Sequence, residues 1–198
     1  EYMVSALMNT EEVRELAKKI MVYEIEKAKL FIDSGANGIT IADDMAFNMG
    51  LFLPPYIMDE IAYPFYEEAI HEIKAYKDVP VILHTDGNIN DAMDRIVELG
   101  FDGLHSLQPS AGMDIGEIKE KYGHRLCLIG NIDLDYIMTF SSPEEVRENV
   151  RMTIKSAAKG SGYILSTCNT LVDIIPPENA AAMYEEAETF DMEEIWNG

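Results

Sequence analysis

The stretch Val79–Asn88, Val-Pro-Val-Ile-Leu-His-Thr-Asp-Gly-Asn, places a continuous apolar run directly before a cluster of polar residues. A short apolar run without polar alternation is typical of a strand that is buried on both faces of a parallel sheet. The polar residues that follow it mark the point where the strand leaves the core. The same order, an apolar run and then polar residues, recurs four more times along the 198 residues, so this repeated unit decides the fold.

Segments with helical periodicity separate these runs. Apolar residues at three- and four-residue spacing predict helices over 10–33, 56–76, 89–99, 113–122 and 177–190. A further helix is predicted to begin after Ser142 and end near Gly160, because Pro143 and Glu145 complete a capping-box signature with Ser142. The strands are predicted at 38–42, 79–83, 102–104, 125–129 and 162–165.

Five strands that alternate with helices indicate an α/β fold with a parallel sheet. A TIM-type (β/α) barrel fits better than a dinucleotide-binding fold, because no Gly-rich phosphate loop follows the first strand. A TIM barrel closes with eight strands, so the sequence predicts the C-terminal five βα units of a (β/α)8 barrel. We expect residues 1–198 to form a single domain from which the N-terminal units are missing. A small, open, doubly wound sheet is the alternative.

The charge balance restricts the partners. The chain has 15 Lys and Arg against 36 Asp and Glu, a formal net charge of -21 at pH 7, which repels nucleic-acid phosphates and anionic membrane surfaces. No apolar run approaches the roughly 20 residues that cross a bilayer. The 2 cysteines are far apart, as expected of a chain without a disulfide framework. We therefore expect a cytoplasmic protein with a small-molecule substrate and no nucleic-acid or membrane partner.

Polar side chains gather where the predicted strands end, which is where (β/α) barrels carry their active sites. None of them is Lys or Arg. They are Asp43 and Asp44, His84 and Asp86, His105, Asn131 and Asp133, and Cys168 with Asn169.

These residue types suggest a metal site. His84 and Asp86 are two apart on an extended segment, so their side chains point the same way and can share one ion, and Cys168 adds a thiolate from the last strand. One imidazole, one carboxylate and one thiolate with an open position suit catalytic zinc. The alternative is that His84 and Asp86 form a hydrogen-bonded pair that only fixes a loop.

The other residues at the strand exits are predicted to contact the substrate. Asp43 and Asp44 are candidates for general acid and base, but neighbours in a strand point to opposite sides, so only one of them is expected to face the barrel mouth. A loop-capping role is the alternative for this pair. Met45, beside the same exit, is a candidate for lining an apolar pocket. We predict Asp44 and His84 as catalytic, and the substrate-binding set as Asp43, Asp44, Met45, His105, Asn131, Asp133 and Asn169.

Five stretches, in this order, resemble the uroporphyrinogen decarboxylase superfamily: Gly35–Asp44, Pro54, Pro80–Asn88, Gly130–Asp133 and Pro177–Asn179. The resemblance covers nearly the whole chain. It implies a TIM barrel longer than this chain, and it implies an enzyme, because the superfamily includes the decarboxylases of haem biosynthesis and cobalamin-dependent methyltransferases.

The methyltransferase branch implies a zinc site at the residues already singled out. In its zinc-dependent members, a His-x-Cys pair after the fifth strand and a later cysteine bind zinc, which activates a thiol. His84 matches that histidine, and Asp86 stands in place of the first cysteine. Cys168 lies about one residue before the second cysteine, at whose position Asn169 falls. The resemblance also implies cobalamin, as a substrate or on a corrinoid partner protein, and is compatible with a homodimer.

We therefore predict a corrinoid-linked methyltransferase with His84, Asp86 and Cys168 as metal ligands. Uroporphyrinogen decarboxylase is the runner-up. Its substrate carries many carboxylates, whereas no Arg or Lys follows any predicted strand. The third reading is a non-catalytic or truncated binding domain.

Overall fold

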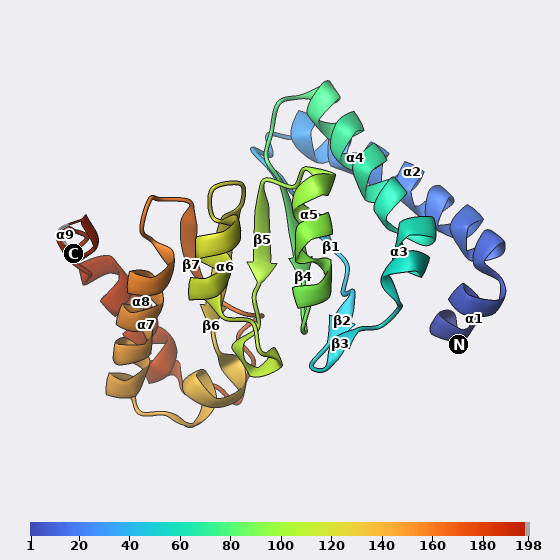
Figure 1. Cartoon of the computed structure of the whole chain (residues 1–198). Coiled ribbons are helices and arrows are strands. Elements are labelled where there is room, and N and C mark those ends of the chain that lie inside the picture. The colour runs from blue at the N-terminus through green and yellow to red at the C-terminus, as the bar shows by residue number, and fades with distance from the viewer. Residues whose placement is uncertain (197–198) are drawn as a thin grey trace.

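The computed structural model describes residues 1–196. Five parallel strands form one sheet in the order β1 (Ile39–Ala42), β4 (Val81–Thr85), β5 (Gly103–Ser106), β6 (Cys127–Ile132) and β7 (Tyr163–Thr167) (Figure 1). The strands therefore lie side by side in the order of the sequence. A doubly wound sheet reverses this order at a switch point, whereas a barrel does not. The prediction of a parallel sheet with partial TIM-barrel topology is confirmed.

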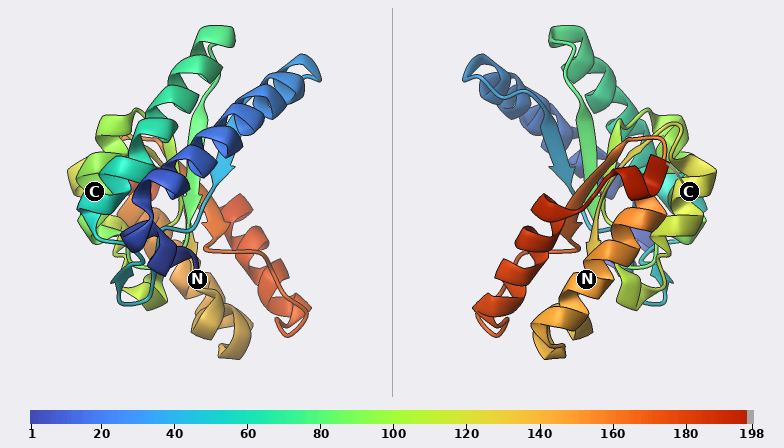
Figure 2. Two further views of the ribbon diagram at one scale, coloured as in Figure 1. Left: turned by 90° about the vertical axis from the view of Figure 1, so that its right-hand side faces the viewer. Right: turned by 90° about the vertical axis from the view of Figure 1, so that its left-hand side faces the viewer.

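Helices connect these strands, and α5 and α6 lie in front of the sheet in Figure 1. Figure 2 shows α2 beside α4 on one side of the molecule, and α7 beside α8 on the other. The longer helices are α1 (Tyr2–Met8), α2 (Thr10–Asp33), α3 (Pro55–Ile61), α4 (Tyr63–Tyr76), α5 (Met93–Leu99), α6 (Ile115–Tyr122), α7 (Pro143–Ala157) and α8 (Pro177–Thr189). The shorter elements are the helical turns η1 (Asn90–Ala92), η2 (Pro109–Ala111), η3 (Leu134–Met138) and α9 (Glu193–Trp196), and the antiparallel strands β2 (Ala46–Phe47) and β3 (Gly50–Leu51).

Several elements differ from the sequence-based expectation. β4 and β5 continue beyond their predicted ends to Thr85 and Ser106, so His84 and His105 lie within strands. The helix predicted over 56–76 is broken at Ala62 into α3 and α4. Pro64 has no N–H to donate to a carbonyl in the preceding turn, so it is accommodated in the first turn of a new helix. The strand predicted over 125–129 continues as β6 to Ile132, so Asn131 lies in the strand and not after it.

The two faces of the sheet differ in burial. Leu83, Leu104 and Leu128 lie in one row across β4, β5 and β6 and are fully buried in the main apolar core. The opposite row contains His84 and His105, followed by Ile129 and Ile164, and Ile164 is 53% exposed. This second row corresponds to the inside of a barrel, and it is the face on which the candidate site lies.

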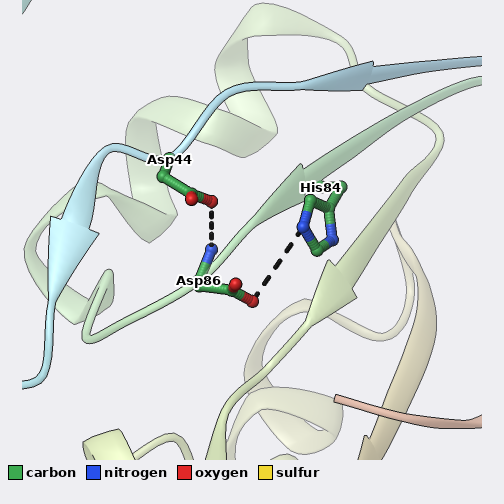
Figure 3. Close-up of side chains that lie close together, drawn as sticks. All are labelled: Asp44, His84 and Asp86. Carbon is green, nitrogen blue, oxygen red and sulfur yellow. Dashed lines mark hydrogen bonds and ion pairs between the residues drawn. The ribbon is translucent and has the colours of Figure 1, made fainter. Parts of the chain in front are cut away.

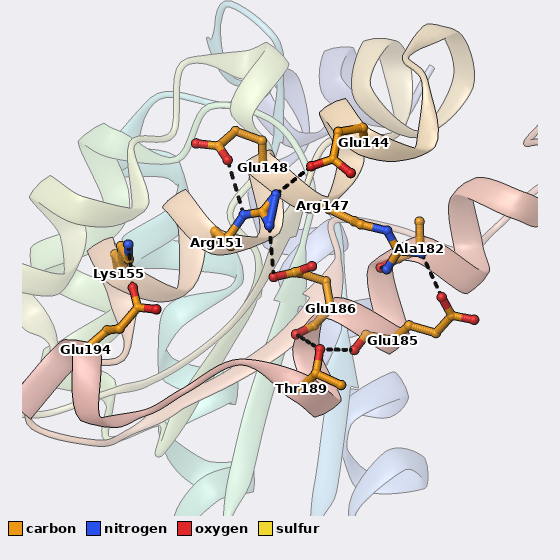
Figure 4. A network of polar contacts seen from close by, with 10 residues as sticks. All are labelled: Glu144, Arg147, Glu148, Arg151, Lys155, Ala182, Glu185, Glu186, Thr189 and Glu194. Atoms are coloured by element: carbon orange, nitrogen blue, oxygen red, sulfur yellow. Dashed lines mark hydrogen bonds and ion pairs between the residues drawn. The ribbon is translucent and has the colours of Figure 1, made fainter.

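The predicted capping box at the start of α7 is confirmed. Glu145 accepts a hydrogen bond from the backbone N–H of Ser142 at 2.7 Å, and the Ser142 hydroxyl accepts one from the N–H of Glu145 at 3.4 Å. Arg151 on this helix then bonds Glu186 of α8 at 3.4 Å (Figure 4). Arg151 is 31% and Glu186 14% exposed, and partly exposed ion pairs contribute little to stability, so we assign the packing of α7 on α8 mainly to the second apolar cluster.

Within the described part of the chain, no helix has the combination of length and apolar character that crossing a membrane requires.

Candidate functional site

Three polar side chains converge where β1 and β4 end. Asp44, His84 and Asp86 each offer one ligand atom, and these atoms lie within 4.8 Å of one another (Figure 3). His84 and Asp86 are half-buried and Asp44 is exposed. His84 and Asp86 point the same way, as their two-residue spacing predicts. One imidazole and two carboxylates form a donor set that zinc accepts in proteins.

Hydrogen bonds from backbone N–H groups hold the two strand exits together. Asp44 accepts a hydrogen bond from the backbone N–H of Asp86 at 3.0 Å, and the carbonyl of His84 accepts one from the N–H of Asp43 at 3.0 Å. The Thr85 hydroxyl accepts a hydrogen bond from the backbone N–H of Met45 at 3.0 Å. The pairing of Asp43 with His84 and the bond from the Asp86 N–H to the Asp44 carboxylate therefore hold Asp44 close to Asp86.

The turn that carries Asp86 depends on Gly87. Its φ is +84°, a conformation that favours glycine, and a Cβ added here would lie 2.7 Å from the carbonyl carbon and oxygen of Ala46. The hairpin β2–β3 thus packs directly on this turn, and Phe47 accepts the N–H of Asn88 at 2.9 Å. Neither the hairpin nor its close approach was predicted from the sequence.

The two carboxylate oxygens of Asp86 have different surroundings. Oδ2 accepts a hydrogen bond from the side-chain amide of Asn169, which follows β7. Oδ1 is buried and has no hydrogen-bond partner, and it lies 4.0 Å from Nε2 of His84, beyond hydrogen-bond length. A buried carboxylate oxygen without a donor is costly unless something else neutralises it. A cation bound between Asp86 and His84 would neutralise this oxygen.

A second histidine lies behind the first. Nδ1 of His105 is 2.7 Å from Nδ1 of His84, the two rings stack with centroids 4.8 Å apart, and Nε2 of His105 is 3.0 Å from the carbonyl oxygen of Thr167. Loss of solvent around His105 is the largest influence on its pKa, which lies below the usual value. The ring of His105 is therefore kept neutral at pH 7.

Asp43 faces away from the three-residue group. Its carboxylate accepts a hydrogen bond from the hydroxyl of Tyr66, on α4, at 2.5 Å. Loss of solvent raises the pKa of Asp43, the Tyr66 hydrogen bond lowers it, and repulsion from Asp44 raises it further. Of the two adjacent carboxylates, Asp44 is thus the one that lies with His84 and Asp86.

Cys168 is not part of the group of ligand atoms that His84 and Asp86 form with Asp44. The thiol is buried, which raises its pKa to about 11, with a hydrogen bond from the backbone of Leu134 acting in the opposite direction. Without a metal ion, a pKa of this size keeps the thiol protonated at neutral pH, and zinc would have to displace this proton to bind Cys168. Asp44 is the third residue whose ligand atom lies near those of His84 and Asp86, and the role of Cys168 as a metal ligand stays a prediction.

Three other candidate residues contact the protein's own core or backbone. Met45 is 3% exposed and belongs to the main core. Asn131 is buried and donates to the carbonyl of Leu107 at 2.8 Å. Asp133 caps η3 by accepting the backbone N–H groups of Tyr136 and Ile137. Their proposed contacts with a substrate stay predictions.

Sequence reasoning missed two features of the site. The closeness of Asp44 to His84 and Asp86 had a signal, because β1 and β4 were both predicted to end in polar residues and parallel neighbours end at the same edge. The hydrogen bond between His105 and the carbonyl of Thr167 had no signal in the sequence, since it joins β5 to β7 across the curved face of the sheet.

Comparison with known proteins agrees with this fold. A sequence model described as uroporphyrinogen decarboxylase (URO-D) matches residues 2–190. A uroporphyrinogen decarboxylase of Trichodesmium erythraeum is 29% identical over 175 residues, 88% of this chain and 45% of that protein. One from Legionella pneumophila (strain Corby) is 26% identical over 174 residues, 87% of this chain and 46% of that protein.

A methyltransferase from Methanosarcina mazei has a similar solved structure, with a TM-score of 0.79 at 20% identity over 94% of this chain and 52% of that one. At this identity the likeness shows a shared fold. The chain spans about half the length of the relatives that it matches. Since the family match extends from residue 2 to residue 190, the chain belongs to the uroporphyrinogen decarboxylase (URO-D) family.

Proposed function

We propose that this chain provides the metal-binding side of a corrinoid-linked methyltransferase, which transfers a methyl group between a small substrate and a cobalamin cofactor or corrinoid protein. The observation that carries the proposal is the convergence of Asp44, His84 and Asp86 around the unpartnered Oδ1 of Asp86. The likeness to a methyltransferase of Methanosarcina mazei supports it.

The residues fit a zinc ion. His84 offers an imidazole nitrogen, and Asp44 and Asp86 offer carboxylate oxygens, all of which are accepted zinc ligands. A cation here would neutralise the buried oxygen of Asp86 that no protein donor reaches. Zinc bound by these residues would act as a Lewis acid that lowers the pKa of a thiol or hydroxyl acceptor.

The chain's own residues prepare this site. Asn169 holds Oδ2 of Asp86, which leaves Oδ1 directed toward His84. The N–H of Asp86 holds one oxygen of Asp44. Asp44 is the most exposed of the three, so we assign its second oxygen to take the proton that a substrate thiol loses.

Uroporphyrinogen decarboxylase is the second candidate, because the curated relatives carry this name. The carboxylates of Asp44 and Asp86 are evidence against a decarboxylase, since they would repel a tetrapyrrole that bears many carboxylates. In the described residues, neither carboxylate has an Arg or Lys partner, the side chains that would bind such a substrate.

We also propose that residues 1–198 form one domain that closes into a barrel with further βα units. Among residues 1–196, β1 and β7 each have a neighbouring strand on one edge only. The exposed Ile164 lies on the face that a closed barrel buries.

Metal analysis and two activity assays test the proposal. We expect about one zinc ion per chain, retained by His71→Ala, whose side chain is 78% exposed, and lost in both His84→Ala and Asp86→Asn. The protein should also transfer a methyl group from methylcobalamin to a thiol. Full methyl transfer by a metal-free protein would contradict the proposed zinc site. Consumption of uroporphyrinogen without methyl transfer would establish the decarboxylase instead, and neither activity would favour a non-catalytic domain.

A further inference from the structure

The chain contains a contact between two histidines that the metal site does not by itself explain. His84 and His105 lie directly opposite each other on β4 and β5, and their Nδ1 atoms are 2.7 Å apart. Two nitrogens at this distance share one proton in a hydrogen bond. The question is which ring carries it.

The second contact of His105 answers this question. Nε2 of His105 lies 3.0 Å from the carbonyl oxygen of Thr167, which can only accept, so Nε2 carries a proton. A neutral imidazole has a single N–H, so Nδ1 of His105 is bare and accepts the proton of His84. His84 is then protonated on Nδ1, and its Nε2 is bare.

The opposite arrangement does not match the geometry. In that arrangement His105 would donate from Nδ1 to His84 in addition to donating from Nε2 to Thr167. His84 would then carry its proton on Nε2 and would need an acceptor there. The Oδ1 atom of Asp86, which faces this nitrogen, is 4.0 Å away, too far for a hydrogen bond. The contacts therefore favour a bare Nε2 on His84 that faces the carboxylate of Asp86.

We propose that His105 is a positioning residue that fixes His84 in the tautomer protonated on Nδ1, so that the lone pair of Nε2 points toward Asp86. This inference rests on the proposed metal site, because a metal ion binds the lone pair of a neutral imidazole. A hydrogen-bond partner on the other ring nitrogen is how proteins orient such a ligand.

The exit of β7 anchors both sides of this arrangement. The carbonyl of Thr167 holds His105, and two residues later the amide of Asn169 holds Asp86. One short segment thus orients the imidazole through His105 and the carboxylate directly. His105 itself has both ring nitrogens engaged, which leaves it no lone pair for a metal or a substrate.

The tautomer of His84 is measurable without any metal. The chain has 4 histidines, so long-range ¹H–¹⁵N correlation spectra of the metal-free protein at pH 8.5 resolve which nitrogen of each ring is protonated. The His84 signal is identified from its loss in His84→Gln. We expect His84 to be protonated on Nδ1 in the wild-type protein, and to change to the usual Nε2-protonated form in His105→Phe.

Cobalt(II) and zinc binding provide the second measurement. His105→Phe keeps the ring volume and removes both nitrogens, and we expect it to weaken binding about 10- to 100-fold. His105→Asn retains an oxygen near the position of Nδ1, and its affinity should fall between the two. His71→Phe, a substitution at an exposed histidine, should change neither the tautomer nor the affinity.

Two results would overturn the inference: a wild-type His84 that carries its proton on Nε2, or a His105→Phe variant that leaves the tautomer unchanged. If His105→Phe does not fold, the wild-type spectrum and His105→Asn still decide the question. A wild-type protein that shows the expected tautomer but binds no metal contradicts the proposed zinc site and leaves the positioning role supported.

Discussion

Replacing Gly87 by alanine tests whether the hairpin β2–β3 holds the turn that carries Asp86. The new Cβ would lie 2.7 Å from the carbonyl group of Ala46 and 2.8 Å from the N–H nitrogen of Phe47. These are backbone atoms, so they cannot move away by changing a rotamer. Either the hairpin or the turn has to shift.

Gly160→Ala is the matched control. The φ of Gly160 is +79°, close to the +84° of Gly87, but a Cβ at Gly160 would meet no atom within 4 Å. Both substitutions force alanine into the left-handed region, which costs about 1–2 kcal/mol. Only Gly87→Ala adds the steric conflict, for which overpacking of a well-packed site suggests a further cost of about 1–3 kcal/mol.

Urea unfolding of the two variants and the wild type measures this difference. We expect the free energy of unfolding of Gly87→Ala to lie below that of Gly160→Ala by about 1–3 kcal/mol, with similar m values. Zinc affinity should fall in Gly87→Ala alone, because the shift displaces Asp86. Equal losses of stability in the two variants, with unchanged zinc affinity, would refute the assigned role of the hairpin.

Two substitutions and one chemical modification test other parts of the structure. Ser142→Ala removes the capping box of α7 and should lower the free energy of unfolding by about 1 kcal/mol in urea titrations. An unchanged free energy of unfolding would show that the cap does not stabilise α7. Leu104→Ala, in the fully buried row, should cost about 2–5 kcal/mol by the same assay, and a loss below 1 kcal/mol would mean that this row is not the core. The folded-state pKa of Cys168, about 11, exceeds its ordinary value of 9.0, so the stability that its buried thiol contributes is complete below pH 9 and is lost as pH rises through 11. Alkylation by iodoacetamide should accordingly be slow at pH 8 in the folded protein and fast after unfolding, as mass spectrometry of the modified cysteine will show.

The order of elements and most of their bounds were accessible from the sequence, because apolar periodicity is a local property. The five strands, their parallel direction and the cap at Ser142 all follow from residues close to one another in the chain. The break at Ala62 and the hairpin β2–β3 were missed. The first depends on a single proline within a strong helical pattern, and the second on two strands of only two residues each.

The candidate site was predicted in part. The sequence alone determined that His84 and Asp86 point the same way, since residues two apart on a strand share a face. Only the tertiary structure decided that Asp44 completes the group of ligand atoms and that Cys168 lies outside it. It also decided that His105 bonds both His84 and the carbonyl of Thr167. The curvature of the sheet and the packing of each loop set these contacts, and both depend on residues far apart in the sequence.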